Sequence, residues 1–142
     1  MDTNKLSVTL IDEKQYEDKL KKLNLNVPVW IDPISIKCYE KKEIIEILLD
    51  GETLAFYVLP YYVKDGKKWL ERKYRYFAYL SPVFVKDCPN KKRKEAIYMI
   101  FNYIFTNYDY MYMPLHPSFT EISSIQGLGA FIESRHTHVL TD

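Results

Sequence analysis

Three strand-like segments joined by two Asp-Gly pairs constrain the fold of this chain more than any other feature. The segments are Glu43–Leu49, Glu52–Val63 and Lys67–Leu80. Asp50-Gly51 and Asp65-Gly66 lie at the two junctions. An Asp-Gly pair between apolar runs is a strong hairpin signal, because tight hairpin turns require positive φ at their central residues. The sequence therefore predicts an antiparallel meander of three strands.

Two details refine this meander. Glu43–Leu49 has apolar residues on both faces, which favours a central position in a sheet. Pro60 lies near the end of the second segment and has no N–H to donate to a neighbouring strand. It therefore predicts a sheet edge or a bulge at this point.

The chain before the meander contains a short strand and a helix. Ser7–Ile11 alternates as a strand does, and Asp12 with Gln15 three residues later forms a capping-box pattern. The apolar stripe that follows has helical spacing and consists of Tyr16, Leu20 and Leu23. Ser35–Lys42 is ambiguous and is compatible with a second short helix.

The chain after the meander alternates between helices and strands. We expect a helix at Lys91–Thr106 with Asn90 as its cap, then a strand at Tyr108–Met113. The core-facing positions of this helix are Ile97, Ile100, Phe101, Ile104 and Phe105. A short helix capped by Ser118 or Thr120 precedes a final strand at Ala130–Leu140.

The element order is thus β-α-(α)-β-β-β-α-β-α-β in a single domain of residues 1–142. This order predicts an α/β (α+β) fold with a mixed, largely antiparallel sheet and helices on both faces.

Charge and composition exclude several classes of protein. Twenty Lys and Arg against nineteen Asp and Glu leave a net charge of +1, so no global field attracts nucleic acid or membranes. The N-terminus resembles no signal peptide and no apolar run could span a membrane, so we expect a cytoplasmic protein. Cys38 and Cys88 are expected to be free thiols, with a disulfide left open for a secreted chain.

Two basic segments are candidate binding sites. Four consecutive cations begin the predicted helix, namely Lys91, Lys92, Arg93 and Lys94. They oppose the helix dipole, so an anion such as a nucleotide, RNA or lipid phosphate would be stabilised there. The alternative is a solvated run of charge.

The second candidate is an acceptor or partner surface made of basic and aromatic side chains. Its residues are Trp69, Lys73, Arg75, Tyr79 and His116. Alternating cations and rings can stack nucleobases, as in single-stranded RNA platforms. Because the rings of the third segment fall on both of its faces, packing in the core is the competing interpretation.

The C-terminal segment contains patterns that only superficially indicate sites. The glycines of Gln126–Ala130 precede a predicted strand and are interpreted as a helix stop and turn. His136 and His138 share a strand face, and His116 could supply a third nitrogen. No carboxylate or cysteine accompanies them locally, so we expect no metal site. A nucleophilic Cys38 or Cys88 is not expected either, because nothing orients a base beside it.

Several segments resemble the first half of the two-domain FemAB-like proteins, which are tandem GNAT-like acyl- or aminoacyltransferases. The matching segments are Asp50-Gly51, Leu59–Lys64, Tyr79–Pro82, Pro114–Phe119, Gly129–Phe131 and Arg135–Leu140. The element order is also similar to that of the GNAT acyltransferase fold. The resemblance extends from about Trp30 to the C-terminus and rests on scaffold positions, with no catalytic signature among them.

The resemblance implies a GNAT-like unit that supports the fold and binds the acceptor, while a missing C-terminal GNAT-like half holds the donor. This chain would then bind no cofactor itself, and acyl-CoA or aminoacyl-tRNA would belong to a longer protein. Residues 81–90 contain no glycine to form a phosphate cradle, which fits this expectation. Two alternatives are a self-associating interaction module, paired through Phe131–Leu140, and a small complete N-acetyltransferase.

Overall fold

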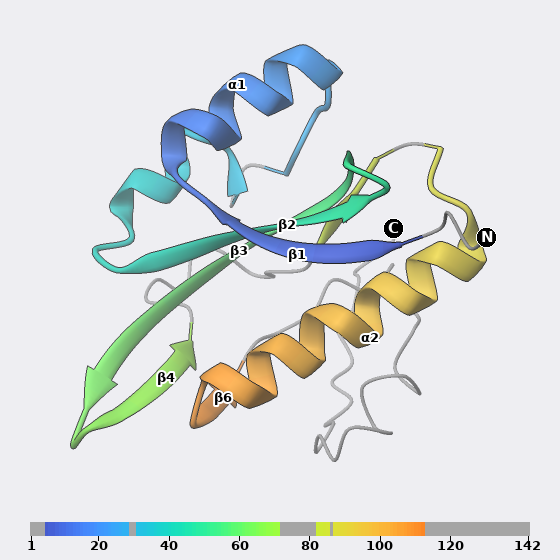
Figure 1. The fold of residues 1–142 in the computed structure, drawn as a ribbon. Coiled ribbons are helices and arrows are strands. Elements are labelled where there is room, and N and C mark those ends of the chain that lie inside the picture. The colour runs from blue at the N-terminus through green and yellow to red at the C-terminus, as the bar shows by residue number, and fades with distance from the viewer. Residues whose placement is uncertain (1–4, 29–30, 72–81, 86, 113–142) are drawn as a thin grey trace, which may run out of the picture.

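The computed structural model describes residues 5–28, 31–71, 82–85 and 87–112. In chain order the elements are β1 (Leu6–Ile11), α1 (Glu13–Leu23), the 3-10 helix η2 (Ser35–Cys38), β2 (Lys42–Leu49), β3 (Glu52–Lys64), β4 (Lys67–Glu71), β5 (Val83–Phe84), α2 (Asn90–Asn107) and β6 (Tyr110–Tyr112). The sheet has the order β1-β2-β3-β4-β6, with β5 paired to β3. Among the described strand pairs only β4 and β6 are parallel, and α1 and α2 lie on opposite faces of the sheet (Figure 1). The predicted mixed, largely antiparallel fold is confirmed.

Both predicted hairpin turns are present. Asp50 and Gly51 have φ of 51° and 85°, and Asp65 and Gly66 have φ of 53° and 72°. These left-handed values allow a two-residue turn to match the twist of the strands that it connects. The turns therefore set the β2–β3 and β3–β4 pairings from local chemistry.

Proline and a bulge shape the long central strand β3. The register with β2 shifts between Ile47 and Leu48, where Leu54 is the extra residue of β3. Farther along β3, the Tyr61 N–H donates to Lys41 on the β2 side, so Pro60 presents its missing donor to the opposite side. Among the described residues, that side pairs with β4 from Tyr61 onward and with β5 at Ala55 and Phe56. Pro60 thus lies between the part of β3 that pairs with β4 and the part that pairs with β5. A residue without an N–H donor is tolerated at such a gap between hydrogen-bonded strands.

The first helix begins where the sequence predicts. Asp12 caps α1, and its side chain and that of Gln15 form the reciprocal capping box. Tyr16 and Leu20 are buried, and the Tyr16 ring meets Phe56 of β3 edge-on at 5.3 Å. Leu23, the third residue of the predicted apolar stripe, is 41% exposed in the last turn of the helix.

The second helix packs on the other face of the sheet. The predicted core positions Ile97, Ile100, Phe101 and Ile104 are fully buried, and Phe105 packs partly against them. Phe101 contacts Tyr57 of β3 with ring centroids 6.2 Å apart. The prediction of Asn90 as the cap was wrong, because Asn90 is the first helical residue and Pro89 occupies the cap position without a side-chain hydrogen bond.

One strand begins later than predicted, and one strand was not predicted at all. Tyr108 ends α2 by donating its N–H to Ile104, so β6 begins at Tyr110. The two-residue strand β5 was not predicted, because it is too short to show a hydrophobic period. The predicted elements after Tyr112 and the segment from residue 72 to residue 81 lie outside the described residues. No helix in the described part of the chain is long and apolar enough to cross a membrane.

Candidate functional site

The N-terminus of α2 is a candidate anion site. The first N–H groups of a helix have no intrahelical acceptor, and the N-cap residue Pro89 provides no side-chain hydrogen bond to them. The first turn contains no acidic residue. This helix end therefore presents the positive end of the dipole together with several cations.

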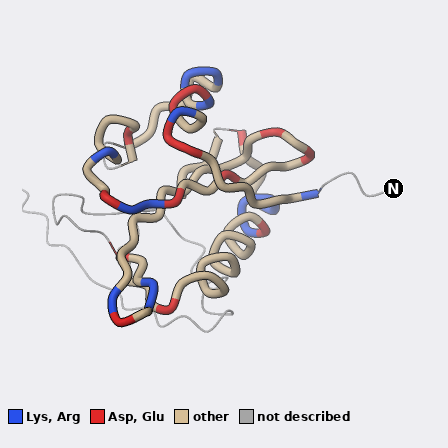
Figure 2. Tube along the Cα trace, turned by 60° about the vertical axis from the view of Figure 1, so that its left-hand side comes forward, with Lys and Arg blue, Asp and Glu red and all other residues tan. Residues whose placement is uncertain are grey.

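The four predicted cations occupy different surroundings at this helix end, where Figure 2 shows the basic residues gathered. Lys92 is paired with Glu95 at 3.1 Å and is mostly buried. The Arg93 guanidinium lies 4.5 Å from the centre of the Phe84 ring of β5. Lys91 and Lys94 are exposed and form no ion pair with any described residue. The structure thus brings the cations together around a single helix start and leaves two of them available to a ligand.

Different strands lie at the two ends of α2, because β5 precedes its start in the chain and β6 follows its C-terminal end. β6 is the outer neighbour of β4 and pairs with it from Trp69 to Glu71. β5 is bonded to β3 on its inner side, and no described strand lies on its outer side. α2 follows β5 in the chain, and the Arg93 guanidinium over the Phe84 ring places the cationic start of α2 beside β5.

Both cysteines are free thiols, as predicted. The Cys88 Sγ lies 3.6 Å from the Pro89 carbonyl oxygen, immediately before α2. Burial raises the pKa of the Cys88 thiol, and the nearby Arg93 charge partly opposes this increase. A raised pKa lowers the thiolate fraction of Cys88, whereas a nucleophilic cysteine requires a large thiolate fraction. The described residues contain no group of three His, Cys, Asp or Glu that could hold a metal ion.

Of the predicted acceptor surface, only Trp69 is described. Its indole stacks against Tyr110 of β6 at 4.0 Å and against Tyr62 of β3 at 5.9 Å. Tyr62 and Tyr110 are 39% and 48% exposed. An aromatic row thus crosses three strands at this end of the sheet. The remaining members of the predicted surface lie outside the described residues, and they are Lys73, Arg75, Tyr79 and His116.

A polar cluster on the α2 face of the sheet was not predicted. The Glu43 carboxylate accepts hydrogen bonds from the hydroxyl of Tyr108 and from the Lys68 amine, the latter at 3.0 Å. The Tyr103 hydroxyl lies 3.5 Å from the same carboxylate. The Lys68 ammonium also lies 4.3 Å from the centre of the Tyr108 ring. Because Glu43 and Tyr108 are 65 positions apart, no local pattern could reveal this cluster, which ties the end of α2 to β2 and β4.

We expect the buried tyrosines to make the fold sensitive to alkali. Burial raises the pKa of Tyr16, Tyr57 and Tyr108, and the hydrogen bond to Glu43 adds to the increase at Tyr108. In the unfolded chain these phenols ionise near pH 10. Their contribution to stability is therefore complete below about pH 10 and is lost as the pH rises further. Absorbance at 295 nm should show exposed tyrosines ionising first and these three only as the far-UV circular dichroism signal collapses. Ionisation of every tyrosine in one step near pH 10 with intact secondary structure would contradict this expectation.

A shallow cleft of about 380 Å³ lies at the C-terminal end of α1. Its lining includes Glu17, Asp32 and the 79% exposed Ile34. Glu17 is paired with Lys21 at 3.3 Å, and Asp32 accepts the Ile34 N–H. Both carboxylates thus have partners within the chain.

The comparisons with known proteins show the fold of the chain. No protein-family profile and no curated protein sequence matches it. Among solved structures, a possible acetyltransferase from Clostridium difficile 630 matches with a TM-score of 0.53 and 11% identity, over 96% of this chain and 97% of that protein. A ribosomal-protein-alanine N-acetyltransferase from Brucella melitensis biovar Abortus 2308 matches with a TM-score of 0.55 and 9% identity, over 97% and 99%. Glucosamine-6-phosphate N-acetyltransferase from Arabidopsis thaliana matches with a TM-score of 0.52 and 11% identity, over 97% and 99%.

The chain therefore has the GNAT fold. At these identities the likeness concerns the architecture, and function depends on the residues placed upon it.

Proposed function

We propose that this chain is a small N-acyltransferase that uses an acyl-CoA donor. The observation that supports this proposal best is the cationic, uncapped start of α2 at the end of β5. A helix start of this kind stabilises a pyrophosphate through its N–H groups and its dipole. The nearly full-length match to several acetyltransferase structures also supports an acyltransferase rather than a non-catalytic unit.

The proposed donor would lie with its acyl chain along the side of β5 where no described strand lies and its phosphates at α2. Lys91 and Lys94 are exposed and would contact phosphate oxygens, while Arg93 is held over Phe84. No glycine occurs between residues 81 and 90, so side chains would contribute more to phosphate binding than a backbone cradle. In the reaction the acceptor amine attacks the thioester carbonyl, an amide bond forms, and the CoA thiol leaves with a proton from the amine.

The aromatic row of Tyr62, Trp69 and Tyr110 is the proposed acceptor surface. Its exposed rings would contact a planar or apolar part of the acceptor. The structural neighbours named above include enzymes for two different acceptors, a protein alanine and glucosamine-6-phosphate. Because one fold serves such different amines, the neighbours do not specify the acceptor of this chain.

Charge reversal at the α2 start tests the donor site. We expect Lys91→Glu/Lys94→Glu to weaken acetyl-CoA binding by tenfold or more, because two attractive contacts of about 0.5–1 kcal/mol each become repulsive. Isothermal titration calorimetry with acetyl-CoA and with 3′,5′-ADP measures this change. Both probes should weaken together if the cations bind phosphate.

The matched control is Lys14→Glu/Lys37→Glu, which changes the net charge equally at exposed positions of α1 and η2. This control should leave the affinity within about twofold. Failure of the wild-type chain to bind acetyl-CoA would overturn the donor site. An equal loss in the control would show that only the total charge matters.

A second candidate is the FemAB-like reading, in which this unit supports the acceptor and a C-terminal GNAT-like half binds the donor. The glycine-free segment before α2 and the exposed aromatic row favour it. Aminoacyl-tRNA would then be a possible donor, and the basic helix start would contact RNA phosphate. A chain that binds a short single-stranded RNA but not acetyl-CoA would support this candidate over the first.

A further inference from the structure

We propose that two copies of this chain pair through the open edge of β1 and form a continuous sheet across a two-fold axis. β1 ends the strand order of the described sheet. Its residues Ser7, Thr9 and Leu10 are exposed, and no described strand pairs with the outer side of β1. An uncovered edge strand is a template for pairing with another strand.

The backbone direction identifies which groups are free. The N–H and C=O of Lys5 both bond to Asp50 on the β2 side. Because these groups alternate sides along a strand, those of Leu6, Val8 and Leu10 point away from β2. Three residues in alternating positions thus offer donors and acceptors to a partner.

The sequence of β1 is self-complementary about Val8. The segment Leu6–Leu10 reads Leu-Ser-Val-Thr-Leu, with apolar and hydroxyl residues in mirror order. In an antiparallel pair centred on Val8, this residue faces the partner's Val8, and Leu6 faces the partner's Leu10. Every outward N–H and C=O of these three residues then has a partner, because all of them fall in hydrogen-bonded pairs. Shifting the register by two residues leaves some of these groups unpaired.

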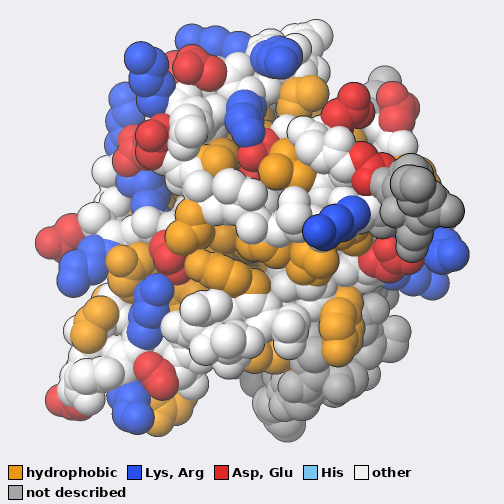
Figure 3. Space-filling model, viewed as in Figure 1, with side chains coloured by type: hydrophobic (Ala, Val, Ile, Leu, Met, Phe, Trp, Pro, Cys, Tyr) orange, Lys and Arg blue, Asp and Glu red, His pale blue; other side chains and the backbone are white. Residues whose placement is uncertain are grey.

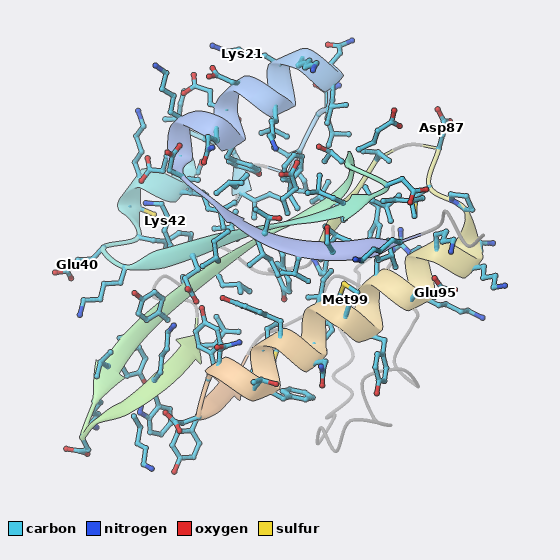
Figure 4. All side chains as sticks on the ribbon, viewed as in Figure 1. Lys21, Glu40, Lys42, Asp87, Glu95 and Met99 are labelled. Atoms are coloured by element: carbon cyan, nitrogen blue, oxygen red, sulfur yellow. The ribbon has the colours of Figure 1, made fainter. Side chains whose placement is uncertain are left out.

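The side chains of the same three residues are apolar and lie on the α2 face of the sheet. Val8 and Leu10 stand opposite Ile47 and Ile45 of β2. Figure 3 shows apolar side chains along the line between β1 and α2, where Leu10 is 52% exposed. Met99 lies on the side of α2 that faces β1 (Figure 4). In the two-fold pair these apolar side chains would meet their symmetry mates and continue the layer between sheet and helix.

Charge does not protect this edge. Between Lys5 and Asp12 the strand contains no charged residue and no proline. Natural edge strands that remain single are commonly blocked by such residues. The edge of β1 contains no such blocking residue, and its sequence is symmetric about Val8. Both features favour pairing with β1 of a second copy of the chain in an isologous dimer.

Cysteine cross-linking tests the register directly. In the full chain carrying Cys38→Ser and Cys88→Ser, we expect Val8→Cys to form a disulfide-linked dimer under mild oxidation. The two Val8 Cα atoms would be about 5.5 Å apart, within the range of a disulfide. Leu10→Cys is the matched control, because its two copies would be displaced by about 13 Å along the strand. On non-reducing gels, the disulfide-linked dimer should form at least ten times faster for V8C than for L10C. Equal rates would overturn the proposed register.

Sedimentation velocity over a dilution series tests the dimer without a cysteine. The wild-type chain should be dimeric, and Leu10→Lys should shift it to monomer by placing two extra charges in the apolar layer. Ile34→Lys removes another exposed apolar residue, on the η2 side, and should leave the dimer intact. Circular dichroism verifies that each variant is folded. A wild-type chain that is monomeric throughout the series, or a dimer insensitive to Leu10→Lys, would overturn the proposal.

Discussion

Replacing Lys19 by methionine should destabilise the fold by about 3 kcal/mol, because it leaves a buried carboxylate without its cation. Glu46 is fully buried and is the one charged side chain in the described core. The Lys19 amine lies 2.5 Å from one of its oxygens, and the Thr53 hydroxyl donates to the other. Urea denaturation followed by circular dichroism measures the loss, which is a large fraction of an ordinary domain stability.

The two partners of this ion pair should respond unequally. Lys19 is 36% exposed and can be solvated when Glu46 is neutralised, so Glu46→Gln should cost less than Lys19→Met. Adding Glu46→Gln to Lys19→Met should restore part of the stability, because no charge is then buried. Lys21→Met on the same helix removes an exposed pair with Glu17 and should change the free energy of unfolding by less than about 1 kcal/mol. Equal effects of Lys19→Met and Lys21→Met would contradict the burial argument.

The second large effect is expected at Phe101, where substitution by alanine should cost about 3–5 kcal/mol. Phe101 is fully buried between α2 and the sheet and contacts Tyr57 and Phe105. Removing its ring opens a cavity that close-packed neighbours can fill only in part. The same urea titration measures this change in the free energy of unfolding.

Tyr98→Ala is the control for Phe101→Ala, because Tyr98 is on the same helix and is 53% exposed. It removes an aromatic ring from the same element at little cost in buried contacts. We expect its effect to be within about 0.5 kcal/mol of zero. If the two substitutions had similar effects, α2 would not pack against the sheet as described.

The elements that could be predicted depend on neighbouring residues. The Asp-Gly turns require positive φ at adjacent positions, and the α1 cap requires an acceptor and a donor three residues apart. The core face of α2 repeats with the helical period. Each of these signals lies within one window of the sequence, so the backbone states were predictable before any tertiary contact was known.

The candidate donor site was only half predictable. The cations of residues 91–94 are evident in the sequence, but the sequence does not show that Arg93 is held over Phe84 or that Lys92 is paired with Glu95. The expected Asn90 cap was one residue too late, because helix starts are set by both local and packing forces. Of the predicted acceptor surface only Trp69 can be assessed, and its stacking partners come from β3 and β6.

By itself, the sequence determined the meander, its two turns and the apolar faces of both helices, because these follow from residues at most a few positions apart. Only the tertiary structure decided that Glu46 meets Lys19 across 27 positions and that Pro60 lies between the β4 and β5 pairings. It likewise decided that β1 ends the described sheet with its edge open. Such features depend on which strands and helices become neighbours, and that choice is made by the burial of the whole core, which no local window contains.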